Sequence, residues 1–419
     1  MDLLIKNAHI VDDNASHNNK KTDILIENGI ITAIENDISK NDIECFDAQN
    51  TFVSPGWMEI FSDFADPGFE HKETITTGAL AAVHGGFTKV LILPNTSPSV
   101  QNKASVEYVV NKANNAAADI IPLGAVSREL EGKDLAEMYD MADSGSTAFS
   151  DGKKTIQSPG LLVKALQYIK TINGLIITQP VESTFGSNGL MNEGIVSTQL
   201  GLPGMPAVAE HIMIMRDIEL LRYTNSRLHI TGISTAKSVE LISNAKKEGL
   251  NITCSVTPYH LLLCDEDLTS YDTNLKLNTP LRNRSDRDAL RDAVSNGQID
   301  SIAVHHFPQH LDDKDCEFEY AKNGMIGLQT AYPVVKTAIP ELTPLQIARL
   351  FSLNNRAIFG LPTTIKKGQP AELTVFSTEK TFIFTKEINK SKSINSPFFG
   401  KELKGRVEAV FAKNNFYKN

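Results

Sequence analysis

The sequence predicts an α/β protein: a (β/α)8 barrel of the TIM type with a small β-sandwich domain formed from both ends of the chain. In the middle of the chain, apolar strands alternate with helical segments, which is typical of a parallel sheet covered by helices. The number of these units over roughly 300 residues favours a closed barrel over an open sheet. Both ends of the chain carry short strands and turns instead.

The two chain ends are expected to form one sheet domain together. Near the start, "LLIKNAHIVDD" and "DILIENGIITAIEND" read as strands, and Asn28-Gly29 within the second is a good hairpin signal. Near the other end, "AELTVFST", "TFIFTKE" and "GRVEAVFAKN" also read as strands. We therefore expect residues 1–52 and 363–419 to form the small domain and residues 53–362 to form the barrel.

The predicted barrel strands share a short apolar core that ends in polar or turn residues. They are "TKVLILPN", "DIIPLGAV", "GLIITQPV", "RLHITGIS", "NITCSVTP" and "DSIAVHH". Two clear helices are "MPAVAEHIMIMRDIELLRYT" and "STAKSVELISNAKKEG"; the second begins at a Ser/Thr cap and ends at Gly249. No glycine-rich phosphate loop follows the first strand, which argues against a dinucleotide-binding fold.

Composition excludes several classes of function. The 419 residues are 41% hydrophobic and 22% charged, which is ordinary for a soluble globular protein, and the net charge of −9 gives no basic nucleic-acid footprint. The start of the chain has no secretory pattern, and no apolar run approaches the roughly 18 residues of a membrane span. The scattered cysteines form no CxxC pair, so we expect reduced thiols in a cytoplasmic protein. They are Cys45, Cys254, Cys264 and Cys316.

In a barrel, the polar groups at the carboxyl ends of the strands line the site. These ends are Phe61–Asp63, Pro94-Asn95, Ser150-Asp151, Gln179-Pro180, Thr231-Gly232 and His305-His306. A zinc hydrolase needs three or more His, Asp or Glu side chains around the metal. The strand ends offer only Asp63, Asp151, His305 and His306 for this role, without a short HxH motif, and each is also consistent with an ordinary hydrogen-bonded polar residue. Adjacent strand residues point to opposite faces, so at most one of the two histidines is expected to face the pocket.

Other candidate residues carry weaker signals. Asn95 and Asn278 stand beside proline-containing turns at predicted strand ends, where their amides could contact a ligand or simply shape a loop. His229 lies within an apolar strand and is expected to be a core residue. No GxSxG elbow and no P-loop is present.

The chain resembles the long bacterial dihydroorotases of the amidohydrolase superfamily almost from end to end, and several segments carry this resemblance. They are "DPGFEHKETITTGALAAVHGGFTKVLILPNTSP", "AFSDG", "MNEGIVSTQLGLPGMPAVAEHIMIMRDIELL", "HITGISTAKSVELI", "VTPYHLLL", "YDTNLKLNTPLRNRSDRDAL", "NGQIDSIAVHHFP" and "GMIGLQTAYP". The resemblance implies a barrel with a small β domain. It also implies zinc-dependent interconversion of dihydroorotate and N-carbamoyl-aspartate in pyrimidine synthesis.

The sequence departs from this family at the site. Phe61, Asp63 and Ala65 stand where the resemblance implies a His-x-His metal pair and an arginine that holds the substrate carboxylate. The remaining departures are Pro180 and Gly232 at two ligand histidines, His305 at the catalytic aspartate, Gln309 at a substrate-binding histidine, and Asp151 alone where the family has two aspartates after "FS". Asn95 and Asn278 are retained from the substrate pocket.

These departures predict a catalytically inactive homologue that binds no cofactor and has a structural or regulatory role. Assembly with aspartate transcarbamoylase is one such role. The alternative is an active, metal-dependent cyclic amidohydrolase with zinc at a rearranged site of Asp63, Asp151 and His305. A third hypothesis is a small-molecule binder that uses the remnant pocket. In each case we expect a cytoplasmic homodimer that binds neither nucleic acid nor membrane.

Overall fold

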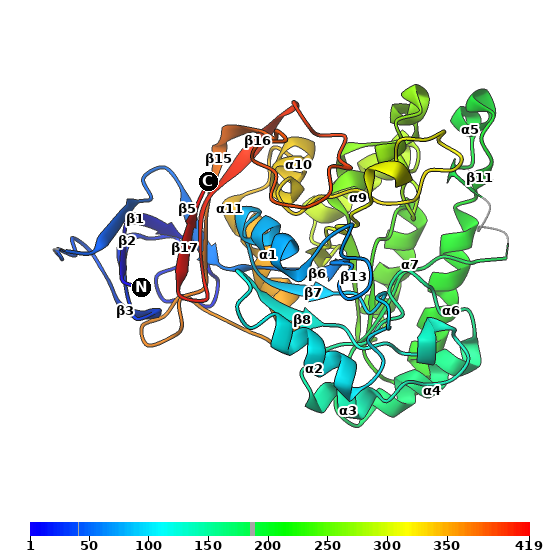
Figure 1. Ribbon diagram of the computed structural model, residues 1–419, viewed down its shortest axis with the longest axis horizontal. Coiled ribbons are helices and arrows are strands. Elements are labelled where there is room, and N and C mark those ends of the chain that lie inside the picture. Colours follow the sequence, from blue (N-terminus) through cyan, green and yellow to red (C-terminus); the bar gives the residue numbers. More distant parts are fainter. Residues whose placement is uncertain (41, 185–188) are drawn as a thin grey trace.

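The computed structural model describes residues 1–40, 42–184 and 189–419, and it shows a helix-covered barrel beside a smaller sheet (Figure 1). Neighbouring barrel strands pair in parallel within two sheets, β6-β7-β8 and β9-β12-β13-β14. These strands are β6 (Trp57–Ser62), β7 (Phe87–Ile92), β8 (Asp119–Pro122), β9 (Ile176–Thr178), β12 (Leu228–Ile230), β13 (Ile252–Val256) and β14 (Ser301–Ile302).

Two irregular junctions complete the ring of strands. The extended segment around Phe149 takes the fourth position, with isolated bridges to Gly124 on one side and Ile176 on the other. Between the last strand and the first, the Asp63 N–H donates to the carbonyl of His306 at 2.9 Å. The predicted (β/α)8 barrel is therefore confirmed.

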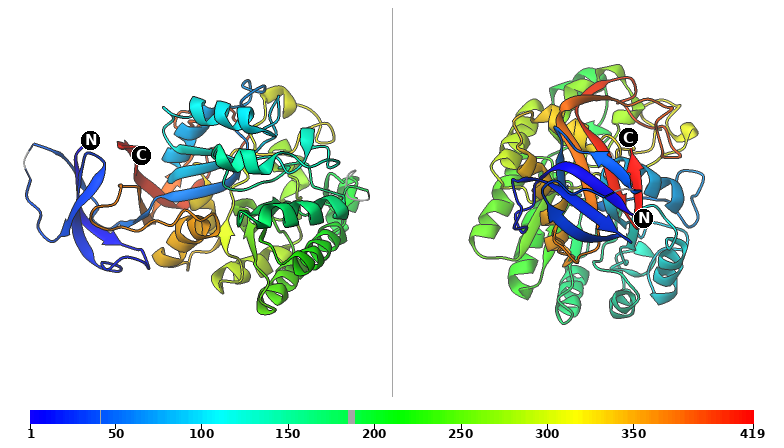
Figure 2. Two further views of the ribbon diagram at one scale, coloured as in Figure 1. Left: turned by 90° about the horizontal axis from the view of Figure 1, so that it is seen from below. Right: turned by 90° about the vertical axis from the view of Figure 1, so that its left-hand side faces the viewer.

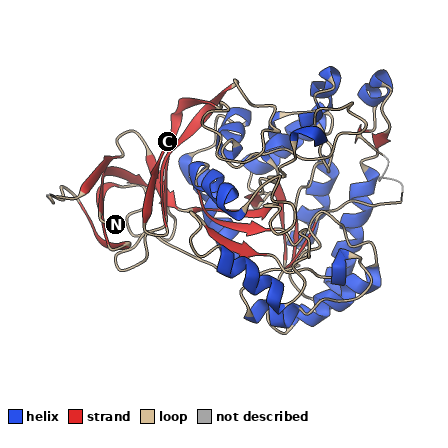
Figure 3. Ribbon diagram, in the orientation of Figure 1, coloured by secondary structure: helices blue, strands red, loops and turns tan. Residues whose placement is uncertain are grey.

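Helices cover the outside of the barrel, as the blue ribbons around the red strands show in Figure 3. They are α1 (Ile75–His84), α2 (Lys103–Lys112), α3 (Met138–Asp143), α4 (Pro159–Lys170), α5 (Ile195–Leu200), α6 (Val208–Thr224), α7 (Ala236–Lys247), α8 (Pro258–Leu262), α9 (Arg284–Ser295), α10 (Ala331–Ala338), α11 (Pro344–Ala348) and α12 (Asn354–Ile358). A short parallel pair, β10 (Met191–Asn192) and β11 (Gly204–Met205), precedes α6. None of the helices in the described ranges has the length and apolar character that crossing a bilayer requires.

The cap expected for the helix after "HITGIS" is present. The Thr235 side chain accepts a hydrogen bond from the Ser238 N–H at the start of α7, which satisfies one of the free donors of the first turn. Two residues after the last helical residue, Gly249 adopts φ +86°, a conformation that glycine reaches without strain. Local capping chemistry therefore sets both ends of this helix.

Both chain ends contribute to an eight-stranded sheet, ordered β17-β16-β15-β5-β1-β2-β3, with β4 paired to β1. Its strands are β1 (Leu3–Ile10), β2 (Lys21–Glu27), β3 (Ile30–Glu35), β4 (Glu44–Asp47), β5 (Phe52–Pro55), β15 (Leu373–Ile383), β16 (Glu402–Ala412) and β17 (Asn415–Lys418). Asn28 and Gly29 have φ values of 52° and 77° in the β2–β3 turn, as a two-residue hairpin turn requires. The two ends meet at β5 and β15, which run antiparallel with Val53 opposite Val375.

The small sheet and the barrel have separate apolar cores. Figure 2 shows β1 to β3 standing away from the barrel, whereas the long β15–β16 ribbon reaches back over it. Trp57, at the start of the first barrel strand, is fully buried at this junction and stacks on Phe351 with ring centroids 4.9 Å apart. The carboxyl ends of the barrel strands lie on the opposite face, where the segment between β15 and β16 contacts Gln309 and Phe307 through Asn395.

Candidate functional site

A cavity of about 460 Å³ lies beside the carboxyl ends of the barrel strands. Its polar wall includes Asp151, Lys153, Lys154, Gln157, Asn278 and Asn323. Asp151 follows the fourth strand position and Asn278 lies between α8 and α9. A polar cavity at this face is where a barrel enzyme binds its substrate.

Asp63 and Lys153 form an ion pair at the barrel mouth. Asp63 directly follows β6 and is 4% exposed, and its carboxylate also accepts a hydrogen bond from the Ala65 N–H at 2.9 Å. The Lys153 ammonium lies 5.8 Å from the centre of the Phe307 ring, within the range of a cation–π contact. Asp63 is therefore neutralised by a side chain of this protein.

Asn95 holds the turn that carries Lys153. Its Nδ2 donates to the Asp151 carbonyl at 3.1 Å, and its Oδ1 accepts from the Lys153 N–H at 3.0 Å. Both ends of the amide are thus occupied by backbone. In this structure Asn95 shapes the loop that presents the lysine.

The Asp151 carboxylate is turned toward the loop after β8. It accepts hydrogen bonds from the backbone N–H groups of Val126 and Ser127, both at 2.9 Å, and from the Ser127 hydroxyl at 2.5 Å. Burial raises the pKa of Asp151 above its ordinary value, while the donors from Ser127 and Val126 oppose that change. Asp151 and Asp63 therefore have different partners and share no ligand position.

His305 packs among aromatic rings in the centre of the barrel. Its ring centroid lies 4.6 Å from that of Phe61 and 5.4 Å from that of Phe307. Burial, with smaller contributions from His260 and His229, lowers the pKa of His305 to about 3, so the imidazole is neutral at physiological pH. Its Nε2 forms a hydrogen bond with Thr231 Oγ1 at 2.8 Å.

A chain of hydrogen bonds continues from this pair across the strands. Ser255 Oγ donates to Thr231 Oγ1 at 2.8 Å and also bonds to His229 Nε2 at 2.9 Å, while His229 Nδ1 bonds to Thr253 Oγ1 at 2.8 Å. Burial lowers the pKa of His229 to about 3. His229 is a neutral, fully bonded core residue, as the apolar strand around it predicted.

The strand-end residues do not fit a zinc ion. Among residues 1–40, 42–184 and 189–419, no group of three or more His, Cys, Asp or Glu side chains is placed to hold a metal. Phe61 and Pro180 carry no donor atom, and a Cβ at Gly232 would lie 2.7 Å from Cε1 of His305. The structure therefore does not bring Asp63, Asp151 and His305 together as the rearranged centre requires.

Gln309 and Ala65, where the resemblance predicts a substrate-binding histidine and an arginine, are both held by local contacts. Gln309 accepts a hydrogen bond from Lys72 Nζ at 2.8 Å and donates to the Asn323 carbonyl at 2.7 Å. Ala65 is buried with φ 56°, in the turn that Asp63 closes. Neither residue presents a charge to the cavity.

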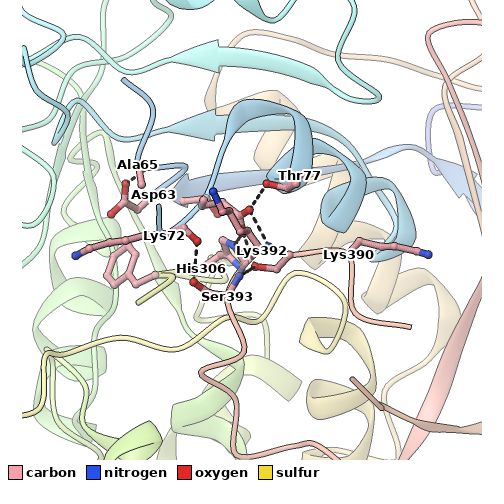
Figure 4. A network of polar contacts seen from close by, with 12 residues as sticks. Asp63, Ala65, Lys72, Thr77, His306, Lys390, Lys392 and Ser393 are labelled. Atoms are coloured by element: carbon pink, nitrogen blue, oxygen red, sulfur yellow. Dashed lines mark hydrogen bonds and ion pairs between the residues drawn. The ribbon is translucent and has the colours of Figure 1, made fainter. Parts of the chain in front are cut away.

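His306 has different partners from its neighbour His305, although neither residue lies within the regular strand, which ends at Ile302 instead of extending to them as the sequence predicted. Its Nδ1 accepts from the Gly327 N–H at 3.1 Å, so its Nε2 carries the proton and donates to Glu73 Oε2 at 3.2 Å. Glu73 also accepts hydrogen bonds from the hydroxyls of Thr77 and Ser391 and from the Lys392 N–H, the last at 3.0 Å. Figure 4 draws this network, with Asp63 and its bond to Ala65 lying apart from it.

The cluster around Glu73 escaped sequence analysis. Burial alone would raise the pKa of Glu73, but the bonds from His306, Ser391 and Thr77 lower it, so the carboxylate is ionised. Its partners come from α1, the end of the last barrel strand and the segment before β16. No local pattern links residues so far apart in the chain. The cluster fastens this late segment to the barrel.

The comparisons with known proteins agree on one family. A family model described as "Dihydro-orotase-like" matches residues 51–238. The dihydroorotase of Acetivibrio thermocellus is 38% identical over 418 residues, covering 99% of this chain and 98% of that protein. The dihydroorotase of Carboxydothermus hydrogenoformans is 39% identical over 412 residues, covering 97% of this chain and 95% of that protein.

Solved structures support the same architecture at lower identity. The L-hydantoinase (dihydropyrimidinase) from Arthrobacter aurescens superposes with a TM-score of 0.87 at 21% identity, over 100% of this chain and 96% of that one. The dihydropyrimidinase from Brevibacillus agri NCHU1002 superposes with a TM-score of 0.84 at 21% identity, over 99% and 95%. At this identity, the similarity shows the fold alone.

The relatives correct one prediction made from the sequence. The lost family positions predicted a catalytically inactive protein with a structural or regulatory role. That prediction is wrong, because dihydroorotases at 37–39% identity match the chain over nearly its whole length. The expectation that the protein needs no cofactor gains no support from these relatives either.

Proposed function

Because this chain belongs to the dihydroorotase-like family, we propose that it is a cyclic amidohydrolase that interconverts dihydroorotate and N-carbamoyl-aspartate. The observation that carries this proposal is the near full-length identity to dihydroorotases. A second observation supports it: the polar cavity lies at the strand face where barrel enzymes work.

The reaction is hydrolysis of a ring amide and its reversal. Water adds to the carbonyl carbon, the C–N bond breaks, and the nitrogen leaves with one proton while the second is released from the new carboxyl group. Zinc would supply hydroxide near neutral pH in such a reaction. Because the strand ends of this chain do not fit zinc, we assign no step to a metal.

Asp151 is our candidate for proton transfer. It lines the cavity, and burial raises its pKa, which favours a carboxyl group that can both take and return a proton. Ser127 and the backbone N–H of Val126 fix its orientation. The Lys153 ammonium, also in the wall, is paired with Asp63 but has further N–H donors for an anionic substrate.

The test is to assay the purified protein in both directions. Dihydroorotate hydrolysis and N-carbamoyl-aspartate cyclisation are each measured after chelator treatment and again with added zinc. Turnover above the uncatalysed rate in either state supports the proposal, and the comparison reports whether a metal takes part. Turnover in neither state overturns it.

We further propose that the protein acts as a homodimer in the cytoplasm. Free thiols at Cys45, Cys254, Cys264 and Cys316 support a reducing compartment. Light scattering coupled to size exclusion should give twice the mass of one chain. A monomeric mass at micromolar concentration would contradict the dimer.

A further inference from the structure

The geometry points to Lys153 as the residue that binds the carboxylate of the ligand, with Asp63 holding the lysine at the barrel mouth. This inference deepens the proposed function and rests on it, since it concerns the same cavity. It assigns a recognition role to a residue outside the positions that the family resemblance singled out. The ligand class is a cyclic amide that carries a carboxylate.

The Lys153 ammonium has hydrogen-bonding capacity left for a ligand. An ammonium has three N–H donors, and Asp63 Oδ2 takes one of them. Within the described part of the chain, no second acceptor lies in hydrogen-bonding range of this nitrogen. The lysine side chain is 36% exposed and lines the cavity, whereas the Asp63 side chain is 5% exposed. The ion pair thus holds the ammonium on the side of the buried Asp63 and leaves the rest of the ammonium open to the cavity.

Neighbouring cations are less suited to the role. Lys72 is bonded to Gln309 and lies 3.5 Å from Asp313, so its ammonium is already engaged. Lys154 also lines the cavity, but its side chain is exposed, and its electrostatic partners Glu131 and Asp151 form no ion pair with it among the described residues. An anchored cation loses less conformational entropy on binding than a free one. Lys153 is therefore the preorganised positive charge of this cavity.

Asn278 supplies a complementary group in the same cavity wall. Its Oδ1 is buried and has no hydrogen-bond donor among the described residues, and a buried acceptor left unpaired is costly. The backbone carbonyl of the same residue is already satisfied by Gln179 Nε2 at 2.7 Å. A ring N–H would satisfy the free Oδ1. A cation and an acceptor in one cavity match a ligand with both a carboxylate and an amide N–H.

The experiment compares two ligands that differ only in the carboxylate. Dihydroorotate and 5,6-dihydrouracil share the ring, but only dihydroorotate is anionic. Dissociation constants are measured by calorimetry at fixed ionic strength for the wild type, for Lys153→Met, for Lys154→Met as the other cation of the wall, and for the matched control Lys164→Met on α4. We expect Lys153→Met to weaken dihydroorotate binding by about 10- to 100-fold, as loss of a charged hydrogen bond does, and to leave dihydrouracil within about threefold. Lys164→Met, which changes an exposed lysine of α4 outside the cavity wall, should resemble the wild type with both ligands.

Three results would overturn the inference: equal losses for both ligands, no loss for either, or a selective loss in Lys154→Met instead. Lys153→Met also strands the buried Asp63, so Lys153→Arg, which keeps the charge, is the second variant and should retain most of the selectivity. If the wild type binds dihydroorotate selectively but shows no turnover, the proposed activity fails and the recognition role stands. If turnover proceeds with an unchanged KM in Lys153→Met, the recognition role fails and the activity stands.

Discussion

The Phe61 ring lies against the imidazole of His305, with ring centroids 4.6 Å apart and ring planes inclined by 35°. These two residues fill the centre of the barrel at the level where its strands end. At both positions the resemblance to the family predicts other side chains. The two side chains are coupled through packing.

Gly232 should be intolerant of any side chain because of His305. It has φ +68°, and a Cβ there would lie 2.7 Å from His305 Cε1. Gly249 is the matched control, since it has φ +86° with no atom within 4 Å of its Cβ position. In urea unfolding, Gly249→Ala should cost about 1 kcal/mol from backbone strain, and Gly232→Ala about 1–3 kcal/mol more.

Adding His305→Ala separates the two effects. His305→Ala has a cost of its own, which should be smaller by at least about 1 kcal/mol in the Gly232→Ala background than in the wild type and unchanged in the Gly249→Ala background, because only the first pair is in contact. Equal losses for the two glycine variants, or an equal cost of His305→Ala in both backgrounds, would contradict this coupling.

Glu59 should make folding stability fall as the pH rises. It is fully buried in the barrel, and burial raises its pKa from 4.5 to about 7 even though Val304, Phe61 and Ser62 donate hydrogen bonds to it. Below pH 4.5, the group is protonated in both states and its contribution to folding is complete. Between pH 4.5 and 7, the unfolded chain releases its proton first, so about 3 kcal/mol is lost across that window.

Unfolding free energies from pH 5 to pH 8 check this prediction. Glu59→Gln should be less stable than the wild type at pH 5 but should lack this part of the pH slope. The exposed Glu35→Gln, a control with the same chemical change, should keep the slope. A wild-type slope that survives in Glu59→Gln would assign the titration to another group.

Asp151→Asn should lower kcat by about 10²- to 10⁴-fold if Asp151 transfers a proton. The amide oxygen can still accept from the Val126 and Ser127 N–H groups, so the cost in unfolding free energy should stay near 1–2 kcal/mol. Asp143→Asn, on the exposed end of α3, is the matched control and should leave both quantities unchanged. Wild-type kcat in a folded Asp151→Asn protein would remove Asp151 from the mechanism.

Ser391→Ala should loosen the segment that precedes β16. It deletes one of the donors to the buried Glu73 carboxylate, at a cost of about 1–3 kcal/mol. Hydrogen exchange of the Lys392 amide, which donates to Glu73 Oε1 at 3.0 Å, should accelerate before the barrel amides do. The exposed Ser285→Ala should change stability by less than about 0.5 kcal/mol. Unchanged exchange at Lys392 would show that Ser391 does not fasten this segment.

Local chemistry made much of the fold predictable. The Asn28-Gly29 turn and the Thr235 cap follow from backbone preferences of a few adjacent residues, and the structure has both. Strand lengths were harder to predict. The run "DSIAVHH" yields only Ser301–Ile302 as a regular strand, because the Val304 N–H donates to the Glu59 side chain and His305 turns to φ 50°. A tertiary contact ended that strand.

The strand-end residues of the site could be located from the sequence, but the residues to which they are bonded could not. Sequence analysis picked out Asp63, Asp151 and His305 at the strand ends, yet each is bonded to a residue that no local pattern connects to it. Lys153 was missed because the anchor that makes it a distinctive cation, Asp63, lies 90 residues away. Loop conformation, which decides such pairings, depends on the completed barrel.

The strands of the small sheet come from both ends of the chain, and the barrel lies between them in the sequence. This order has a consequence for synthesis. The Trp57 N–H donates to Thr374 Oγ1, 317 residues further on, next to the β5–β15 pairing. At ribosomal rates of about 5–20 residues per second, β5 waits roughly 15–60 s for this partner while the barrel is made. During that interval its edge is open to the strands of other nascent chains. Solubility of this protein therefore depends on how well that edge is shielded until β15 emerges.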